Sequence, residues 1–305
     1  MLAAALVLPA SADEAFVTAQ GAGALDIIDV ATMKPLAHLS IGGKPAGIAV
    51  SRDGARAYVT SPEGQFLTVV DARARKVERQ IPIKGGPLGV AVSPDGKSVY
   101  VADLYGKRLV EIDPDRGETR SVAVGAMASG VAVTPDGGII LVADRDDNAI
   151  SVIDSGRFER VATIPVGKHP FGVTIDAAGL RAYTADVESD SVSVIDIGAR
   201  KVIATLKAES RPYTVALARG RIFVANQHAD SVSVFDAASL APVAVLKVGE
   251  YPEGIAASAD GGRVYVANWF ANELWAIDAA SLEILEKAQT GDGPRAFGAF
   301  ISGKR

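Results

Sequence analysis

Short segments in which hydrophobic and polar residues alternate recur along the whole chain. Seven of them end in a hydrophobic pair or near-pair followed by aspartate, as in DIID, TVVD, SVID and WAID. A period of two residues is typical of β-strands, and no long window keeps the 3.6-residue period of a helix. The seven aspartates recur at intervals of 40 to 42 residues, at Asp29, Asp71, Asp113, Asp154, Asp196, Asp236 and Asp278.

A second marker recurs in the same register. It is proline, once replaced by alanine, at the start of an apolar strand: Pro45, Pro87, Ala128, Pro170, Pro212, Pro252 and Pro294. Within one period the pattern predicts four strands, as in HPFGVTID, RAYTAD, SVSVID and KVIATLKA of residues 169–208. Four antiparallel strands repeated about every 40 residues predict an all-β fold, a β-propeller with seven blades.

The two ends of the chain complement each other. The first repeat begins at its second strand, with Phe16, whereas residues 294–302 form a lone first strand. We therefore expect the C-terminal strand to complete the N-terminal blade and close the ring. Residues 13–305 are accordingly predicted to form one propeller domain.

The N-terminal segment predicts export. Residues 1–12 are apolar and end in Ala10-Ser11-Ala12, a small-residue cleavage pattern that places the mature start at Asp13. A charged region before the apolar stretch is missing, which leaves the true start codon open. Twelve residues are too few to span a bilayer as a helix, and no later segment reads as a transmembrane span. The predicted location is periplasmic or secreted.

Composition narrows the partners and cofactors. The net charge of −5 and the pI near 5.3 do not favour nucleic acid, and the basic residues at the predicted loops are interleaved with acidic ones. Cysteine is absent, which excludes disulfides, thiolate metal sites and covalently attached c-type haem. We expect a monomer without a bound cofactor, whose partner is a small ligand or a periplasmic protein.

Four second strands carry a motif that identifies a family resemblance. The segments AYVTS, VYVAD, IFVAN and VYVAN (57–61, 99–103, 222–226 and 264–268), with KPAGIAVSRDG and PLGVAVSPDG, closely resemble YVTN-family propeller repeats over nearly the whole mature chain. The resemblance implies a seven-bladed propeller, commonly periplasmic or at the cell surface, with no single shared activity. Related propellers bind ligands or DNA, serve as amine dehydrogenase subunits, or are lactonase-like or lyase-like metal enzymes. The fold does not choose among these activities.

Function is expected where the repeats differ, in loops gathered at one face of the ring. The residues before and after each proline position form two predicted rings at the channel mouth, and both change character from His169 onward. Together with two neighbouring loops, the second part supplies ten candidate ligand-binding residues: His169, Phe171, Arg211, Tyr213, His228, Tyr251, Glu253, Trp269, Phe270 and Arg295.

Aromatic rings beside arginine and histidine suit a planar, anionic or peptide-like ligand. The same rings could instead fill space between blades, with the arginines in ordinary ion pairs. The sequence favours an exported binding or scaffold protein over an enzyme. Two alternatives stay open: a metal-dependent lactonase-like or lyase-like enzyme using His169, His228 and Glu253, and an accessory subunit of a periplasmic dehydrogenase.

Overall fold

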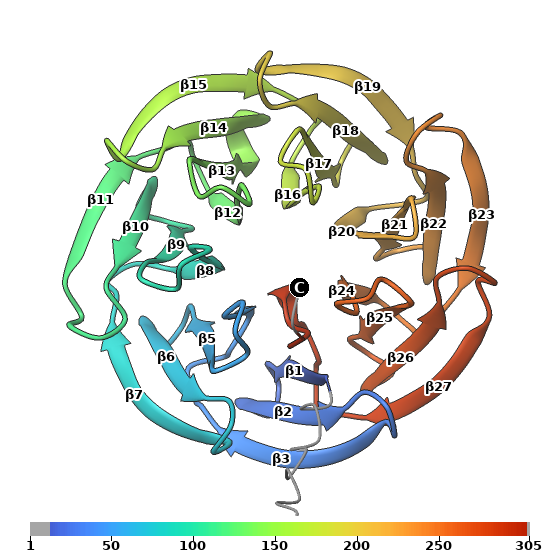
Figure 1. The fold of residues 1–305 in the computed structure, drawn as a ribbon, viewed down its shortest axis with the longest axis horizontal. Helices are drawn as coiled ribbons and strands as arrows, with labels where there is room; N and C mark the ends of the chain where they lie inside the picture. The colour runs from blue at the N-terminus through green and yellow to red at the C-terminus, as the bar shows by residue number, and fades with distance from the viewer. Residues whose placement is uncertain (1–12, 304–305) are drawn as a thin grey trace, which may run out of the picture.

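Seven β-sheets surround a central axis in the computed structural model, which describes residues 13–303 (Figure 1). The predicted signal peptide, residues 1–12, lies outside the described residues. The all-β seven-bladed propeller is confirmed, and the described part of the chain contains only one short 3₁₀-helix, η1 (Arg145–Asp147). No helix within residues 13–303 is long and apolar enough to cross a membrane.

Each complete blade contains four antiparallel strands, numbered in chain order from the axis outward. The innermost strands are β4 (Gly47–Val50), β8 (Pro87–Val92), β12 (Ala128–Val133), β16 (Pro170–Ile175), β20 (Pro212–Ala218), β24 (Pro252–Ala257) and β28 (Phe297–Ala299). The second strands are β1 (Glu14–Ala19), β5 (Arg56–Ser61), β9 (Val99–Asp103), β13 (Ile139–Asp144), β17 (Arg181–Asp186), β21 (Arg221–Asn226) and β25 (Arg263–Asn268).

The third strands are β2 (Ala24–Asp29), β6 (Phe66–Asp71), β10 (Arg108–Ile112), β14 (Ala149–Asp154), β18 (Ser191–Asp196), β22 (Ser231–Asp236) and β26 (Glu273–Asp278). The outermost strands are β3 (Lys34–Ser40), β7 (Lys76–Pro82), β11 (Thr119–Ala123), β15 (Glu159–Pro165), β19 (Lys201–Lys207), β23 (Pro242–Lys247) and β27 (Ile284–Gln289).

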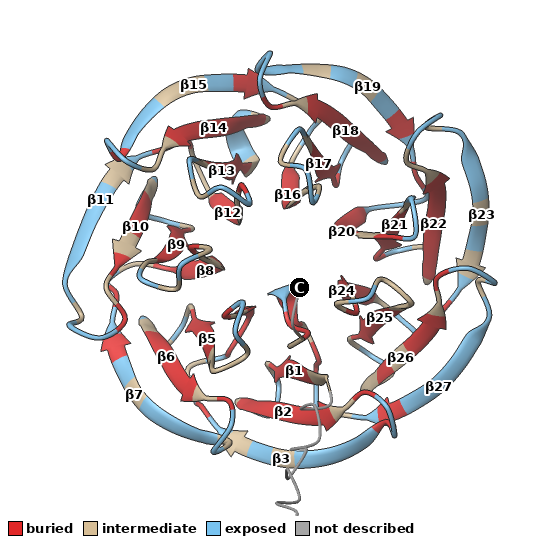
Figure 2. Ribbon diagram, in the orientation of Figure 1, coloured by how far each residue is buried: buried red, intermediate tan, exposed pale blue. Residues whose placement is uncertain are grey.

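The core lies between neighbouring blades rather than at one centre. The second and third strands are buried on both faces, whereas the outermost strands are largely exposed (Figure 2). One core cluster, for example, joins Tyr183 and Val194 of one blade to Val215 and Phe235 of the next. Complete burial of a large apolar side chain contributes about 2–3 kcal/mol, so each blade depends on its neighbours for stability.

Glycine near the start of the innermost strands lets the blades approach each other closely. A Cβ atom on Gly89 would lie 1.9 Å from the carbonyl oxygen of Ser129, and one on Gly47 would lie 2.0 Å from that of Leu88. Neither glycine has a positive φ, so space rather than backbone conformation requires it. The innermost strands therefore converge tightly on the axis.

The C-terminal segment closes the ring as predicted. The backbone nitrogen of Phe16 donates to the carbonyl oxygen of Phe300, and that of Arg295 donates to Thr18. The segment thus runs antiparallel to β1, while β28 within it also pairs in parallel with β4 of the next blade. In Figure 1 the end of the chain, in red, lies near the axis beside the blue strand β1.

The repeated aspartates have structural roles. Those that end the third strands form turns: Asp236 Oδ1 accepts hydrogen bonds from the backbone nitrogens of Ser239 and Ala238, and the turn at Ser239 holds the pKa of this carboxyl below its usual range. The acids that end the second strands are buried, as Asp144 shows. Its Oδ2 accepts from Ser151 at 2.6 Å, its Oδ1 has no hydrogen-bond partner among the described residues, and burial raises its pKa to about 6.

Candidate functional site

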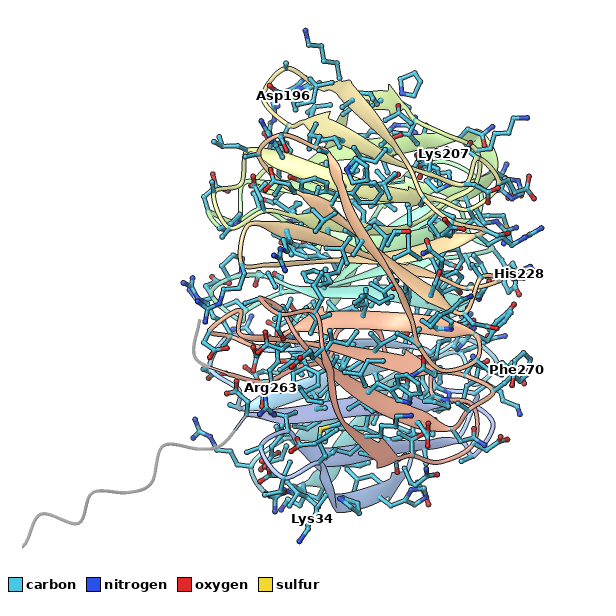
Figure 3. The ribbon with its side chains drawn as sticks, turned by 90° about the vertical axis from the view of Figure 1, so that its right-hand side faces the viewer. Lys34, Asp196, Lys207, His228, Arg263 and Phe270 are labelled. Carbon is cyan, nitrogen blue, oxygen red and sulfur yellow. The ribbon has the colours of Figure 1, made fainter. Side chains whose placement is uncertain are left out.

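Two sets of loops meet at one face of the propeller. The first set leads from an outermost strand to the next blade, and the second joins the second strand to the third. Backbone hydrogen bonds hold them together: the nitrogens of Gln227 and Trp269 donate to the carbonyl oxygens of Arg211 and Tyr251 at 2.8 and 2.9 Å. Figure 3 shows His228 and Phe270 projecting from this face, opposite Asp196 and Arg263. We call it the loop face.

The residues that precede the proline positions share one backbone conformation. Six of the seven have φ between 53° and 65°, in the left-handed region that usually favours glycine: Lys44, Met127, His169, Arg211, Tyr251 and Gly293. The conformation belongs to the repeat, because residues of very different chemistry adopt it. What varies around this ring, which we call the outer ring, is the side chain presented at the loop face.

Four members of the outer ring are held by a side chain from the preceding blade. An Asn or Asp in the loop between the second and third strands accepts a hydrogen bond from the ring residue's backbone nitrogen, at 2.8 to 2.9 Å, in the pairs Asn148–His169, Asp190–Arg211, Asp230–Tyr251 and Asn272–Gly293. The corresponding loop residues of the other three units, Gly23, Gln65 and Lys107, make no such side-chain bond within residues 13–303. These clamps occur in the same four units where the sequence predicts the site.

The residues that follow the proline positions turn toward the axis and are buried. Phe171 and Tyr213 stack with their ring centroids 4.2 Å apart, and Phe297 lies 4.9 Å from Phe171. Leu88 and Ala46 join the same cluster from the opposite side of the ring. Phe171 and Tyr213 are only 7% and 5% exposed. The structure therefore places them in an axial core, as the space-filling interpretation expects, and not on a surface open to a ligand.

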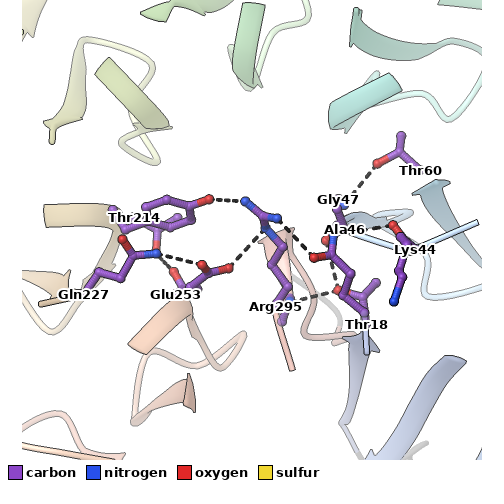
Figure 4. Close-up of polar contacts among 12 residues, drawn as sticks. Thr18, Lys44, Ala46, Gly47, Thr60, Thr214, Gln227, Glu253 and Arg295 are labelled. Carbon is purple, nitrogen blue, oxygen red and sulfur yellow. Dashed lines mark hydrogen bonds and ion pairs between the residues drawn. The ribbon is translucent and has the colours of Figure 1, made fainter. Parts of the chain in front are cut away.

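A charged group lies within this inner ring (Figure 4). Arg295 Nε lies 3.1 Å from Glu253 Oε2, Gln227 Nε2 donates to Glu253 Oε1 at 2.7 Å, and Arg295 Nη2 donates to the hydroxyl of Tyr213. Burial raises the pKa of Glu253, while Arg295 and Gln227 act in the opposite direction. The contact between Nε and Oε2 lacks hydrogen-bond alignment, so both atoms are without a hydrogen-bond partner among the described residues.

Exposed aromatic rings lie on the loop face beside this charged group. The ring of Tyr251 is 5.5 Å from that of His228 and 4.9 Å from that of Phe270, and Phe270 is 58% exposed. Trp269 lies beneath them, with its ring 5.9 Å from the guanidinium of Arg295. We call His228, Tyr251, Trp269 and Phe270 the aromatic surface. Arg211, next to Tyr251 in the outer ring, is exposed.

The two histidines of the metal hypothesis have separate contacts. His169 Nδ1 lies 3.2 Å from Glu188 Oε1, whereas His228 contacts the ring of Tyr251 and Glu253 faces Arg295. Across residues 13–303 no three His, Cys, Asp or Glu side chains form a group that could hold a metal ion. The structure therefore does not bring His169, His228 and Glu253 together as ligands.

An open groove of about 610 Å³ adjoins the candidate site. It lies between the end of β15 and strands β18 and β19, lined by polar groups that include Ser193, Thr205 and Lys207. Asp190, whose Oδ1 holds the backbone of Arg211, also lines it. The groove thus lies beside the clamp that holds Arg211.

Sequence reasoning missed several residues that organise the site. Gln227 and Phe297 became visible only once the blades were placed around the axis. The clamps did leave a signal, because Asn or Asp precedes each clamped outer-ring residue by 21 positions, as Asn148 precedes His169. The ten candidates divide into six at the loop face and four in the inner ring. At the loop face His228, Phe270 and Arg211 are exposed and Tyr251, Trp269 and His169 are half-buried, and in the inner ring Phe171, Tyr213 and Glu253 are buried and Arg295 is half-buried.

Comparisons with known proteins give the fold. The N-terminal part resembles a YNCE-like β-propeller. A model of that family matches residues 3–93. Among solved structures, a chain of Kuenenia stuttgartiensis hydrazine synthase is 24% identical, with a TM-score of 0.75 over 83% of this chain and 88% of its own. A functionally unknown protein from Desulfotomaculum acetoxidans is 15% identical, with a TM-score of 0.81 over 93% of this chain and 99% of its own. No curated protein matches the sequence.

Proposed function

We propose that the chain is an exported β-propeller that binds a small ligand or a partner protein at its loop face, and that it is not an enzyme. The observation that carries this proposal is the aromatic surface, where Tyr251 lies between the rings of His228 and Phe270. Exposed rings supply contact area at low entropic cost, and they concentrate in binding sites for that reason.

The clamps support the proposal because they preorganise the surface. Asp230 fixes the backbone of Tyr251, and Asp190 fixes that of Arg211, before any ligand arrives. A binding surface held in this way loses less conformational entropy on association. The two early outer-ring members Lys44 and Met127 lack this support, which favours the arc from His169 to Arg295 as the binding region.

Binding is tested by ligand-induced thermal stabilisation of the purified protein against a panel of small metabolites and periplasmic extracts. A ligand that binds only the folded state raises the melting temperature by mass action. We expect a stabilising ligand for the wild type, and loss of its effect in the variant Tyr251→Gly combined with Phe270→Ala. Glycine suits position 251 because φ there is 59°.

The matched control is Tyr105→Ala. Tyr105 is 68% exposed in the corresponding loop of another blade, away from the clamped arc. Its removal should leave the stabilisation unchanged. The binding site would lie elsewhere if Tyr105→Ala lost the ligand-induced rise in melting temperature to the same extent. It would also lie elsewhere if the Tyr251→Gly, Phe270→Ala variant kept the full rise.

Export is a separate part of the proposal and rests on residues 1–12. Expression in a Gram-negative host followed by fractionation and N-terminal sequencing should recover a mature protein that begins at Asp13, in the periplasm or the medium. A cytoplasmic protein that retains residues 1–12 would contradict it.

The likeness to a hydrazine synthase chain, at 24% identity, supports the shared fold and does not extend to that enzyme's activity. The alternative of an accessory subunit beside a periplasmic dehydrogenase is one form of the proposed partner binding. The metal-enzyme alternative has no support from the separate contacts of His169, His228 and Glu253.

A further inference from the structure

Two arginines occupy ring positions next to Tyr251 on the loop face. Arg211 precedes it in the outer ring, and Arg295 lies next to it in the inner ring. The positive charges of both arginines act on the Tyr251 hydroxyl, where they partly offset the rise in its pKa that burial and Glu253 cause. The hydroxyl itself has no hydrogen-bond partner among the described residues. The two arginines therefore occupy ring positions that neighbour Tyr251, whose hydroxyl has no partner in the described part of the chain.

Arg295 has donors to spare. A guanidinium carries five N–H groups. Nη2 donates to Tyr213, Nη1 donates to Gln20 at 3.5 Å, and Nε faces Glu253 without hydrogen-bond alignment. At least two N–H groups on the terminal nitrogens thus lack an acceptor within residues 13–303. Figure 4 shows the guanidinium reaching away from its own strand, between Glu253 on one side and the residues near Thr18 on the other.

The guanidinium of Arg211, unlike that of Arg295, makes no ion pair or hydrogen bond with any described residue. Only the backbone of Arg211 is held, by Asp190 at the nitrogen and by Gln227 at the carbonyl oxygen. Of the acids on the neighbouring loops, Asp190 and Asp230 accept backbone hydrogen bonds and Glu253 faces Gln227 and Arg295. The exposed Glu209 and Glu250 make no ion pair with Arg211. Arg211 is therefore an exposed cation beside an aromatic surface.

Two arginines and a hydroxyl beside exposed rings match an anion attached to an aromatic group. We propose that the ligand at this site carries a carboxylate, held by Arg211, Arg295 and the Tyr251 hydroxyl, with an aromatic or planar portion resting on Tyr251 and Phe270. The inference rests on the proposed function and specifies its ligand. A carboxylate suits the forked donors of arginine, and the rings supply the apolar contact.

The test compares two probes that differ only in the charged group, N-acetylphenylalanine and N-acetylphenylalaninamide. Binding is measured by NMR chemical-shift titration at low ionic strength. We expect the acid to bind about tenfold more tightly than the amide, because charge-assisted hydrogen bonds to arginine are stronger than neutral ones. The preference should shrink at high salt, since exposed charges are screened.

Two variants assign the preference to the arginines. Arg211→Gly removes one cation at a position where φ is 53°, so glycine fits without strain. It should lower the preference for the acid at least threefold. Lys107→Gly, which removes an exposed cation at φ 50° from the loop between β9 and β10, should leave it unchanged. The double variant Arg295→Met, Glu253→Gln removes the inner charge without leaving a buried carboxylate unpaired and should abolish the preference.

A third probe, the peptide Ala-Gly-Phe with a free C-terminus, distinguishes a polypeptide C-terminus from a small aromatic acid as the natural ligand. Tighter binding of the peptide than of N-acetylphenylalanine indicates the C-terminus of a polypeptide, and equal binding indicates a small aromatic acid. Either result supports the carboxylate site.

Equal binding of acid and amide, with both lost in Tyr251→Gly, would overturn the carboxylate while preserving the proposed binding function. Absence of any shift up to about 10 mM of either probe, an affinity too weak for recognition, would also overturn it. Failure of the proposed function is seen separately, when no stabilising ligand in the panel depends on Tyr251 and Phe270.

Discussion

The Oδ1 atom of Asp230 accepts a hydrogen bond from the backbone nitrogen of Tyr251 at 2.9 Å, across the boundary between two blades. Tyr251 has a φ of 59°, a conformation that costs a non-glycine residue about 1 kcal/mol or more. The clamp stabilises this conformation and thereby places the ring between His228 and Phe270. The position of the aromatic surface thus depends on contact between blades rather than on any one loop.

Removing the clamp should weaken binding without unfolding the protein. Asp230 itself has a φ of 49°, so Asp230→Gly removes the acceptor without adding strain, and Gly23 stands at the corresponding position of another blade. Loss of one hydrogen bond lowers the free energy of unfolding by about 0.5–1.5 kcal/mol. We expect faster hydrogen exchange at the Tyr251 amide and a several-fold weaker affinity for the loop-face ligand. Asp230→Asn, which keeps Oδ1, is the control, and identical behaviour of the two variants would exclude a positioning role for the clamp.

Because Arg295 and Glu253 form a largely buried ion pair, the effects of mutating them on stability should be strongly coupled. Arg295→Met leaves Glu253, whose side chain is 6% exposed, without its cation. Removing one partner of a buried pair typically costs about 3–5 kcal/mol, whereas replacing both is often nearly neutral. Urea unfolding should therefore show a large loss in the single variant and recovery of most of it in Arg295→Met, Glu253→Gln. Additive losses in this double-mutant cycle would mean that the two side chains act independently.

The buried carboxyl of Asp144 should make the stability of the folded protein depend on pH. Its folded pKa of about 6 lies above the ordinary 3.8, so folding is favoured when the carboxyl is protonated. This contribution is fully present below about pH 4 and is lost as pH rises through 6. Asp144→Asn should therefore unfold like the wild type near pH 4, and should be more stable by up to about 3 kcal/mol near pH 7.5. Asn226 and Asn268 already end the equivalent strands β21 and β25.

The control for this substitution is Asp186→Asn. Asp186 is equally buried, but its oxygens already accept from Thr184 and Ser193, so an amide would lose an acceptor. At pH 7.5 we expect Asp186→Asn to raise the free energy of unfolding less than Asp144→Asn does, or to lower it. A pH-independent effect of Asp144→Asn, measured by urea unfolding at both values, would contradict the assignment of the raised pKa.

Truncation tests the closure of the ring. Residues 294–302 complete the blade of β1 and pair with β4 of the next one, through bonds such as Phe16 to Phe300. Deletion of residues 294–305 removes this strand and buried Phe297, so we expect one cooperative loss of stability throughout the ring, seen as a lower midpoint by circular dichroism. Deletion of residues 304–305 alone should have no effect. Loss of protection confined to the first blade in hydrogen exchange would show instead that the ring tolerates an open end.

Sequence patterns were sufficient for the repeat and its consequences. Period-two alternation and two markers in phase, the aspartates near Asp29 and the prolines near Pro45, predict strands, turns and seven blades because these features depend on local backbone preference and repetition. The complementary ends predict closure for the same reason. The sequence also predicts one arc of the ring as the candidate site, because His169, Arg211 and Tyr251 depart from the repeat.

The sequence could not separate surface from axis. Phe171 and Tyr251 are both aromatic residues next to a marker proline, yet the first is 7% exposed in the axial core and the second contacts Phe270 on the loop face. It offered ion pairs for Arg211 and Arg295 only as an alternative, and the structure pairs Arg295 with Glu253 and leaves Arg211 without an ion pair among the described residues. Nor could the sequence exclude a shared site for His169 and His228.

The sequence by itself determined the all-β repeat, the number of blades and the residues that break the repeat, since each follows from local periodicity. The tertiary structure alone decided which of those residues meet. Contacts such as Arg295 with Tyr213 join residues in different blades, and closing the ring at a fixed radius sets their distance and their exclusion from water. Long-range geometry of this kind leaves no periodic trace in the chain, and it made Phe171 part of the core and Tyr251 part of the aromatic surface.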